Sequence, residues 1–191
     1  MAIKRIAVYC GASSGNNAAF TNTAKELGML LAQQKIELVY GGGKIGLMGV
    51  VADTVIQNGG HVIGVIPEKL WVKEIAHNSI PDLRVVSNMH ERKALMAELA
   101  DAFIVLPGGY GTFEEMFEIL TWAQLGWHQK PIGILNCEDY YTSLLNFLRQ
   151  VVNNKFMKAE HLQILQVSNQ PTDLLQLLQS YVPTKVSKFK A

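Results

Sequence analysis

The chain has 191 residues, of which 49% are hydrophobic and 17% are charged, and its formal net charge at pH 7 is +1. A chain of this length and hydrophobicity can bury a sizeable core as one domain. The near-neutral charge gives no support for binding to nucleic acid or to a membrane surface through bulk electrostatics.

Cysteine content and the first residues bear on the cellular compartment. The two cysteines, Cys10 and Cys137, lie in no CxxC motif and no Cys/His cluster. They predict reduced thiols in a cytoplasmic protein and no structural zinc site. A strand-like run begins at Ile3, which leaves no room for a signal peptide. No apolar stretch is long enough to span a bilayer, so no membrane partner is expected.

Strands and helices are predicted to alternate along the chain. In order, the pattern predicts a strand at Ile3–Cys10, a helix at Ala18–Gln34, a strand at Ile36–Tyr40, a helix ending near Asn58, a strand at His61–Ile66, a strand at Leu83–Ser87, a helix at Met89–Ala100, a strand at Ala102–Leu106, a helix at Phe113–Leu125, a strand at Pro131–Leu135, a helix at Tyr140–Asn153, a weaker strand at Leu162–Val167 and a helix at Thr172–Tyr181.

The strands are short, continuous apolar runs, which are typical of strands buried on both faces of a parallel sheet. The expected fold is therefore α/β: a Rossmann-like, doubly wound and mostly parallel sheet of about seven strands flanked by helices. Residues 1–182 are expected to form a single nucleotide-binding domain. Pro183–Ala191, which contains three lysines, is expected to be a flexible basic tail.

Three loops rich in small residues follow predicted strands: Cys10–Gly15, Gly41–Gly46 and Pro107–Thr112. In an open parallel sheet, ligands bind outside the carboxyl ends of the strands, so these loops are expected to converge on a nucleotide-sized site. The first loop alone is better explained as a tight connection without a ligand, whereas the three loops together favour the site. The candidate substrate-binding residues from the first two loops are Gly11, Ser13, Gly42 and Gly43.

The second loop also allows another interpretation. Gly41, Gly43 and Gly46 formally satisfy G-x-G-x-x-G, the dinucleotide-binding fingerprint. That motif follows the first strand of its unit and has an acidic residue roughly 20 residues further on, whereas Glu68 comes late here. An NAD-dependent enzyme is therefore a weaker alternative. A P-loop is excluded because Ile45 follows Lys44.

The third loop belongs to a strand, a glycine turn and the start of a helix. Its three glycines allow the backbone to turn tightly and to approach a ligand closely. Thr112 is expected to cap the helix, whose free N–H groups and positive dipole end favour a phosphate. Glu115 would place a carboxylate beside that phosphate. Thr112 and Glu115 also have the spacing of a capping box, in which the carboxylate only satisfies the backbone of the cap, and spacing favours neither interpretation.

Two cations stand early in another predicted helix. Asn88 is expected to cap this helix with Glu91 as its partner, so Arg92 and Lys93 follow within about one turn. Positive charge there opposes the helix dipole, at a cost of about 0.3–1 kcal/mol near the first turn. A nearby anion would remove this cost, which favours phosphate or substrate contact over a solvated basic pair.

Together, Met89–Lys93 (MHERK) and Pro107–Glu115 (PGGYGTFEE) resemble the LONELY GUY (LOG) family, the cytokinin riboside 5′-monophosphate phosphoribohydrolases, whose members are often labelled possible lysine decarboxylases. The resemblance covers nearly the whole chain. It also includes Tyr40–Gly43 with Gly46–Gly49, His61–Pro67 and Thr121–Gly126.

The resemblance implies a homodimer that hydrolyses the N-glycosidic bond of a nucleoside 5′-monophosphate. The products would be ribose 5-phosphate and a free base, either adenine or an N6-substituted adenine. No cofactor and no metal are implied. By matching position, Arg92 and Glu115 would be the catalytic pair. Substrate contacts would come from Glu74, Lys93, Gly108, Gly109, Tyr110, Gly111, Thr112, Phe113, Glu114 and Thr121.

The implied chemistry fits these residue types. Hydrolysis of an N-glycoside passes through an oxocarbenium-like sugar, which a carboxylate such as Glu115 can stabilise, or for which it can orient the attacking water. Arg92 would either hold the phosphate or stabilise the departing base. An alternative of another class is a non-catalytic nucleotide or cofactor carrier with the same fold. The sequence leaves open which base is preferred and whether the role is hormone production or nucleotide salvage.

Overall fold

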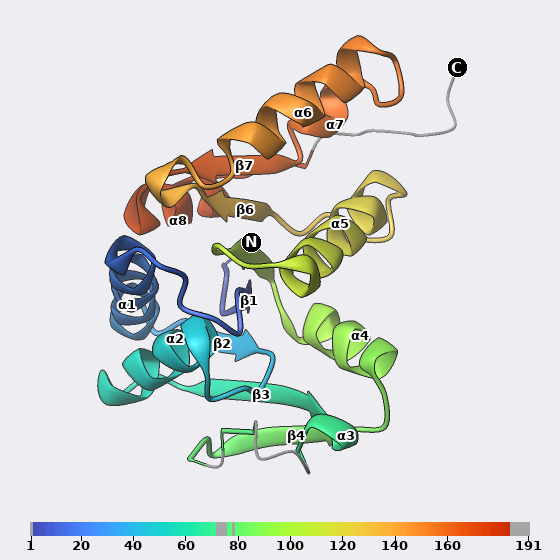
Figure 1. The fold of residues 1–191 in the computed structure, drawn as a ribbon. Coiled ribbons are helices and arrows are strands. Elements are labelled where there is room, and N and C mark those ends of the chain that lie inside the picture. Colours follow the sequence, from blue (N-terminus) through green and yellow to red (C-terminus); the bar gives the residue numbers. More distant parts are fainter. Residues whose placement is uncertain (1, 72–75, 78, 184–191) are drawn as a thin grey trace.

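The computed structural model describes residues 2–71, 76–77 and 79–183. Within these residues, seven strands form one sheet in which every neighbouring pair is parallel, in the order β4-β3-β2-β1-β5-β6-β7 (Figure 1). The predicted α/β doubly wound fold is confirmed. The strands are β1 (Arg5–Tyr9), β2 (Glu37–Tyr40), β3 (Val62–Pro67), β4 (Asp82–Val86), β5 (Ala102–Val105), β6 (Ile132–Leu135) and β7 (Leu165–Ser168).

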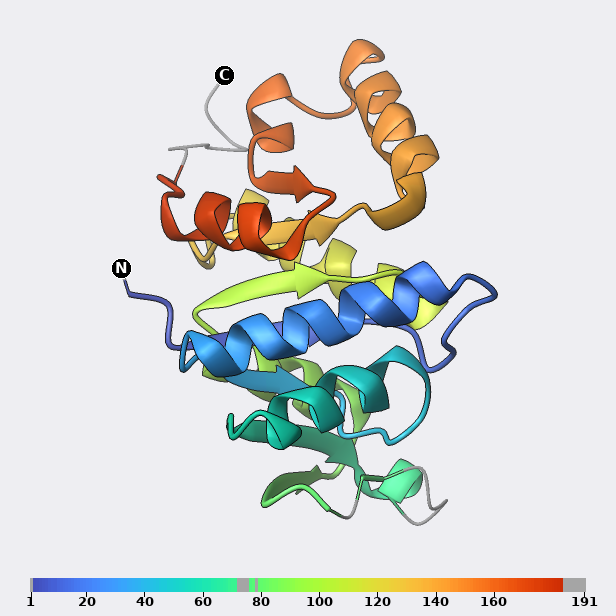
Figure 2. The same ribbon diagram turned by 90° about the vertical axis from the view of Figure 1, so that its left-hand side faces the viewer.

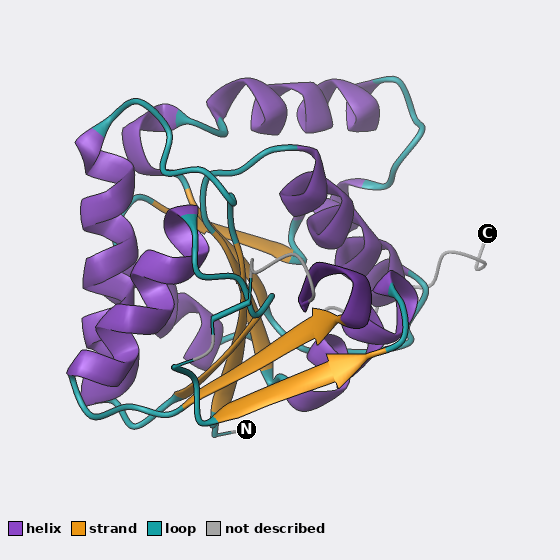
Figure 3. Ribbon diagram, turned by 60° about the horizontal axis from the view of Figure 1, so that its bottom comes forward, coloured by secondary structure: helices purple, strands orange, loops and turns teal. Residues whose placement is uncertain are grey.

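Helices cover both faces of the sheet (Figure 3). They are α1 (Ala18–Gln33), α2 (Gly46–Gln57), α3 (Glu68–Trp71), α4 (Met89–Leu99), α5 (Tyr110–Gln124), α6 (Thr142–Asn153), α7 (Ala159–Leu162) and α8 (Pro171–Gln179), with a 3₁₀ turn at Cys137–Asp139. None of these helices is long and apolar enough to cross a membrane.

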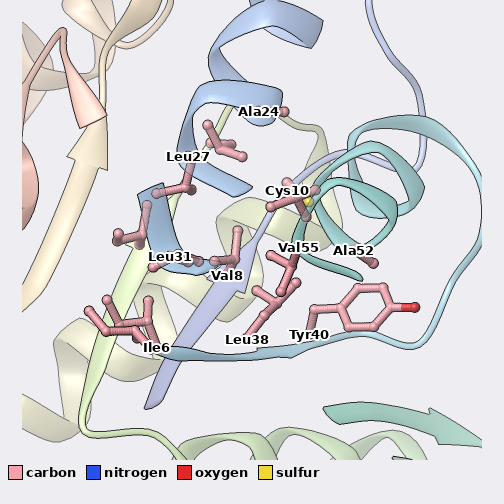
Figure 4. Close-up of a cluster of buried hydrophobic side chains, with 14 of the residues drawn as sticks. Ile6, Val8, Cys10, Ala24, Leu27, Leu31, Leu38, Tyr40, Ala52 and Val55 are labelled. Atoms are coloured by element: carbon pink, nitrogen blue, oxygen red, sulfur yellow. The ribbon is translucent and has the colours of Figure 1, made fainter. Parts of the chain in front are cut away.

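Two hydrophobic cores follow from the alternation of side chains along the strands. From β1, Ile6 and Val8 face one side, where they pack with residues of α1, α2 and α8 (Figures 2 and 4). Ala7 and Tyr9 face the other side and pack with residues of α4, α5 and α6. Because both faces of the central strands are covered, these strands are continuous apolar runs in the sequence.

The strand order reverses between β1 and β5. From β1 the chain builds outward through β2 and β3 to β4, then returns to β5 on the other side of β1. The loops after β1 and β5 therefore lead to helices on opposite faces, and a crevice is expected between them at the carboxyl end of the sheet.

Two predicted boundaries near the C-terminal half are wrong. The helix predicted from Phe113 begins at Tyr110, because Gly109 already has the extended backbone of an N-cap. The strand predicted at Leu162–Val167 is instead β7 at Leu165–Ser168, since the end of α7 occupies Leu162. A short apolar run does not by itself distinguish a helical turn from a strand. The predicted contact residue Glu74 and residues 184–191 of the predicted tail lie outside the described residues.

Tyr40 provides a test of packing in the core that faces α1, α2 and α8. Its ring is fully buried (Figure 4), and its hydroxyl has no hydrogen-bond partner among the described residues. Because a buried hydroxyl without a partner carries an uncompensated desolvation cost, Tyr40→Phe is expected to leave the melting temperature unchanged or raise it. Thermal unfolding measures this.

The matched control is Tyr141→Phe. The hydroxyl of Tyr141 is also buried, but it donates to the Leu106 carbonyl oxygen at 2.8 Å. Its removal is expected to cost about 1–2 kcal/mol, because the carbonyl loses its partner. A larger loss for Tyr40→Phe than for Tyr141→Phe would contradict this account of the core.

Candidate active site

The main cavity lies at the switch point of the sheet. Its volume is about 490 Å³, which is within the usual range for small-molecule sites. It is formed mainly by the loops after β1 and β5, together with side chains from α1, α2 and the turn before α6. The lining residues are Gly11, Ala12, Ser13, Ser14, Gly15, Phe20, Leu47, Pro107, Gly108, Gly109 and Tyr140.

The predicted convergence of the three glycine-rich loops is confirmed by their contacts. The Gly11 N–H donates to the Pro107 carbonyl oxygen at 3.0 Å, which joins the first and third loops. The Leu47 N–H donates to the Gly11 carbonyl oxygen, also at 3.0 Å, which joins the second loop to the first. Gly46 has a φ of 62°, and a Cβ there would lie 2.2 Å from the Ala12 carbonyl carbon. Only glycine permits this approach.

This packing accounts for glycines of the G-x-G-x-x-G segment without a dinucleotide. Gly46 allows contact with Ala12, and Gly41 lies against a guanidinium, because a Cβ at Gly41 would fall 2.1 Å from Nη2 of Arg92. Close packing against the Ala12 backbone and the Arg92 side chain is thus the better explanation for the second loop.

The N-terminus of α5 lies at the third loop. Gly109 is the N-cap and supplies no side chain to satisfy the first N–H groups of the helix. Thr112 is 3% exposed and lies inside the helix, beneath Gly108. The prediction that Thr112 caps the helix is therefore wrong, because the N-cap is Gly109, three residues earlier. Since Gly108 and Gly109 also line the main cavity, the positive end of the α5 dipole can act on an anion bound there.

The two predicted catalytic residues are in contact. Nη1 of Arg92 in α4 donates to Oε1 of Glu115 in α5 at 2.5 Å, and both side chains are about 10% exposed. Nε of Arg92 donates to the Val65 carbonyl oxygen at 3.1 Å. The carboxylate is thus not bound to its own helix start, and the capping-box interpretation is wrong. Among the described residues, the hydrogen bonds of Glu115 involve Oε1, which leaves Oε2 for a ligand or water.

Burial controls the protonation of this site. Burial raises the pKa of Glu115, and the charge and hydrogen bond of Arg92 oppose this effect. Burial also raises the pKa values of Tyr9 and Cys10, and the charge of Glu115 adds to both shifts. The charge of the carboxylate is therefore felt by Tyr9, the last residue of β1, and by Cys10, which precedes Gly11 of the main cavity. It is a weakly solvated negative charge that can interact strongly with a developing positive charge.

Lys93 is paired with two further glutamates of α5. Its side chain is 7% exposed, and Nζ donates to Glu114 and, at 3.0 Å, to Oε1 of Glu118. Burial alone would lower the pKa of Lys93, but the hydrogen bonds and charges of these glutamates outweigh it, so the pKa is raised. Arg92 and Lys93 are therefore not a solvated basic pair.

The start of α4 follows the sequence prediction. Oδ1 of Asn88 accepts from the Glu91 N–H at 3.0 Å, and Oε2 of Glu91 accepts from the Ser87 N–H at 3.0 Å. This capping arrangement fixes the helix that carries Arg92 and Lys93.

The other predicted contact residues lie at several places. Ser13 lines the main cavity, whereas Gly42 and Gly43 are buried beside His77 and Ala76. At the start of α5, Tyr110 is 94% exposed, Gly111 is also exposed, and Phe113 packs edge-on against Tyr141. Thr121 is exposed, bonds to the Phe117 carbonyl oxygen, and lines a separate cavity of about 90 Å³. Their roles as substrate contacts stay predictions.

Sequence reasoning missed Phe20 and Tyr140, which both line the main cavity. Phe20 comes from α1 and Tyr140 from the turn before α6, so no common spacing or motif links either residue to the glycine loops. Among the described residues, no group of three or more His, Cys, Asp or Glu side chains is arranged to hold a metal ion.

The fold and the site define an open, doubly wound α/β protein with a cavity at its switch point. Arg92 and Glu115 are not among the residues that line this cavity, but α5, which carries Glu115, begins at its wall. A family model described as "Possible lysine decarboxylase" matches residues 48–178. Cytokinin riboside 5′-monophosphate phosphoribohydrolase LOG1 of Arabidopsis thaliana is 48% identical over 180 residues, which cover 94% of this chain and 84% of that protein. LOG of Oryza sativa subsp. japonica, with the same enzyme name, is 48% identical over 94% of this chain and 74% of its own length. The chain belongs to the LONELY GUY family, as its motifs predicted.

Solved structures share the fold at lower identity. The molybdenum cofactor binding protein from the phototrophic bacterium Rippkaea orientalis matches with a TM-score of 0.71 and 21% identity, over 94% of this chain and 98% of that chain. The molybdenum cofactor carrier protein of Chlamydomonas reinhardtii matches with a TM-score of 0.68 and 18% identity, over 93% of this chain and 98% of that chain. At these identities the likeness extends to the fold alone.

The buried pair predicts a pH-dependent loss of stability when it is broken. Arg92→Met leaves the Glu115 carboxyl buried without its cation, which is expected to lower the free energy of unfolding by about 3 kcal/mol. The pKa of Glu115 then rises further above its unfolded value. The folded protein binds more protons than the unfolded chain, so stability falls as pH rises. Urea unfolding is expected to show that Arg92→Met loses more of the free energy of unfolding at about pH 8 than at about pH 5.

Arg84→Met is the matched control. Arg84 pairs with Asp82 at 3.0 Å, but the two side chains are 38% and 31% exposed. Loss of this ion pair is expected to lower the free energy of unfolding by less than about 1 kcal/mol. Equal losses at the two sites, or a loss at Arg92 that does not depend on pH, would argue against the proposed electrostatics.

Proposed function

We propose that this chain hydrolyses the N-glycosidic bond of adenosine 5′-monophosphate (AMP) or of its N6-substituted, cytokinin-type derivatives. The products are the free base and ribose 5-phosphate. The observation that carries the proposal is 48% identity, over 94% of the chain, to relatives named cytokinin riboside 5′-monophosphate phosphoribohydrolases. The buried carboxylate of Glu115 supports the same chemistry, because it stands on the second turn of α5, whose N-terminus forms part of the cavity wall.

In this proposal the 5′-phosphate binds to main-chain N–H groups at the start of α5 and in the loop after β1. The ribose then extends toward Glu115. A helix N-terminus suits the phosphate because its N–H groups point outward and its dipole favours negative charge. Phosphate binding energy can orient the ribose at the carboxylate, which accelerates the reaction without touching the bond that breaks.

The reaction requires that water adds a hydroxyl to C1′ while the C1′–N bond breaks. The bond's electron pair leaves with the base, and the water's remaining proton ends on the base or in solvent. Glu115 stabilises the positive charge that develops on the sugar, or orients the water. Arg92 keeps Glu115 ionised in its buried position by charge and hydrogen bonding, and so prepares the carboxylate for this role.

Glu115→Gln tests the role of the charge. The amide keeps the size of the side chain but cannot carry the negative charge that the sugar requires. Release of adenine from AMP, followed by chromatography, is expected to fall by about 10²–10⁴-fold. The control is Glu98→Gln, an exposed glutamate of the neighbouring helix α4 with no proposed role, which is expected to keep wild-type activity.

The same assay separates the hydrolase from its alternatives. Tight binding of AMP by the wild type without base release would favour the carrier with a Rossmann-like fold. A nicotinamide cofactor bound or consumed would favour the NAD-dependent alternative. A panel of nucleoside monophosphates identifies the preferred base.

The phosphate requirement gives a second prediction about activity. Adenosine lacks the group that the start of α5 is proposed to hold, so its kcat/KM is expected to be at least about 100-fold lower than that of AMP. Steady-state kinetics on both compounds measures the ratio. Comparable values would contradict the proposed use of phosphate binding.

We also propose that the protein acts in the cytoplasm as a homodimer. Tyr110 and Phe117 of α5 and Trp127 after it are 94%, 38% and 70% exposed. Exposed aromatic side chains of this kind favour association. A second copy of the chain is the partner that the motif resemblance implies.

A further inference from the structure

Tyr140 makes an unusual contact with the third glycine loop. Its hydroxyl donates to the Gly108 carbonyl oxygen at 2.6 Å. Its ring lines the main cavity and packs edge-on against Phe20, with 5.6 Å between the ring centroids, and against Tyr141, with 4.9 Å. The ring is thus held on two sides, and the hydroxyl is held against the loop.

The backbone before Tyr140 is strained. Glu138 and Asp139 have φ values of 52° and 55°, in the left-handed region that residues with a Cβ avoid. Two such residues in succession persist only where surrounding contacts hold them, and such strain is concentrated at functional sites.

Asn136 supplies the contacts that hold this turn. Its side chain is 6% exposed; Oδ1 accepts from the Tyr141 N–H at 2.7 Å, and Nδ2 donates to Oγ1 of Thr142 at 3.1 Å. The Asn136 carbonyl oxygen also accepts from the Asp139 N–H at 3.2 Å. The strained turn is therefore held by the buried side chain and the carbonyl oxygen of Asn136, and it places Tyr140 against the loop.

The contact with Gly108 determines the direction of a neighbouring donor. The Gly108 carbonyl and the Gly109 N–H belong to one trans peptide, so they point in opposite directions. Holding the carbonyl on Tyr140 therefore also fixes the Gly109 N–H at the start of α5. Two adjacent glycines have few conformational restraints of their own, so an external contact to the carbonyl stabilises this orientation.

We propose that Tyr140 is a positioning residue for phosphate recognition. Its hydroxyl fixes the Gly108–Gly109 peptide so that N–H groups face the phosphate and a carbonyl oxygen, which would repel it, is turned away. This inference rests on the proposed function, since it names the device that prepares the phosphate site. Tyr140 acts through the loop and not on the reacting bond.

Tyr140→Phe tests the inference, because it keeps the ring and removes the hydrogen bond. Loss of one hydrogen bond is expected to lower kcat/KM for AMP by about five- to tenfold and to raise the inhibition constant of ribose 5-phosphate by the same factor. Inhibition by adenine, which carries no phosphate, is expected to be unchanged. The control Tyr40→Phe removes a buried hydroxyl without a partner among the described residues and is expected to alter none of these constants.

Selectivity for the phosphate decides the outcome. Equal weakening of ribose 5-phosphate and adenine would mean a general structural role and would overturn the proposal, as would unchanged constants for AMP and ribose 5-phosphate. If the wild type releases no base, the proposed function fails separately. Calorimetry with AMP then tests Tyr140: a dissociation constant raised about five- to tenfold in the variant supports the inference, and equal constants refute it.

Discussion

The buried ion pair between Arg92 and Glu115 is the interaction on which the site depends. Neither charge could be buried alone at reasonable cost, because an isolated ion in the protein interior loses its hydration without compensation. Each residue therefore requires the other, and the pair ties α4 to α5 on one face of the sheet. The bond from Nε of Arg92 to the Val65 carbonyl oxygen extends this link to β3. A carboxylate held in this way keeps its position before any ligand arrives.

The second constraint is the topology of the sheet. Because β1 and β5 are neighbours whose following helices lie on opposite faces, their loops separate and leave room for the main cavity. Glycines allow these loops to meet through main-chain hydrogen bonds without closing the space. The ion pair and the cavity thus have a common origin, since α5 begins at the cavity wall and carries Glu115 on its second turn.

The sequence contained much of this arrangement, because local chemistry determines several of its parts. Continuous apolar strands predicted the parallel sheet, and Asn88 with Glu91 predicted the start of α4. The start of α5 was placed too late, because Thr112 has a side-chain oxygen that can cap a helix, whereas the actual N-cap, Gly109, has no side chain and is recognised only by its extended backbone. Tyr140 could not be found, since its contact with Gly108 spans 32 residues and depends on a strained turn that no pattern indicates.

The charges of the site also decide how its tasks are divided. Arg92 and Lys93 are two cations, and they already contact three carboxylates, those of Glu114, Glu115 and Glu118. This cluster carries no surplus positive charge with which to hold a phosphate. The anions that the structure places beside these two cations are glutamates of α5, and contact of Arg92 or Lys93 with substrate stays a prediction. In the proposed function, the phosphate therefore depends on neutral donors, the main-chain N–H groups at the start of α5, whose direction is set by backbone geometry and not by charge. Recognition of the phosphate and stabilisation of the sugar are therefore assigned to opposite ends of the first two turns of one helix.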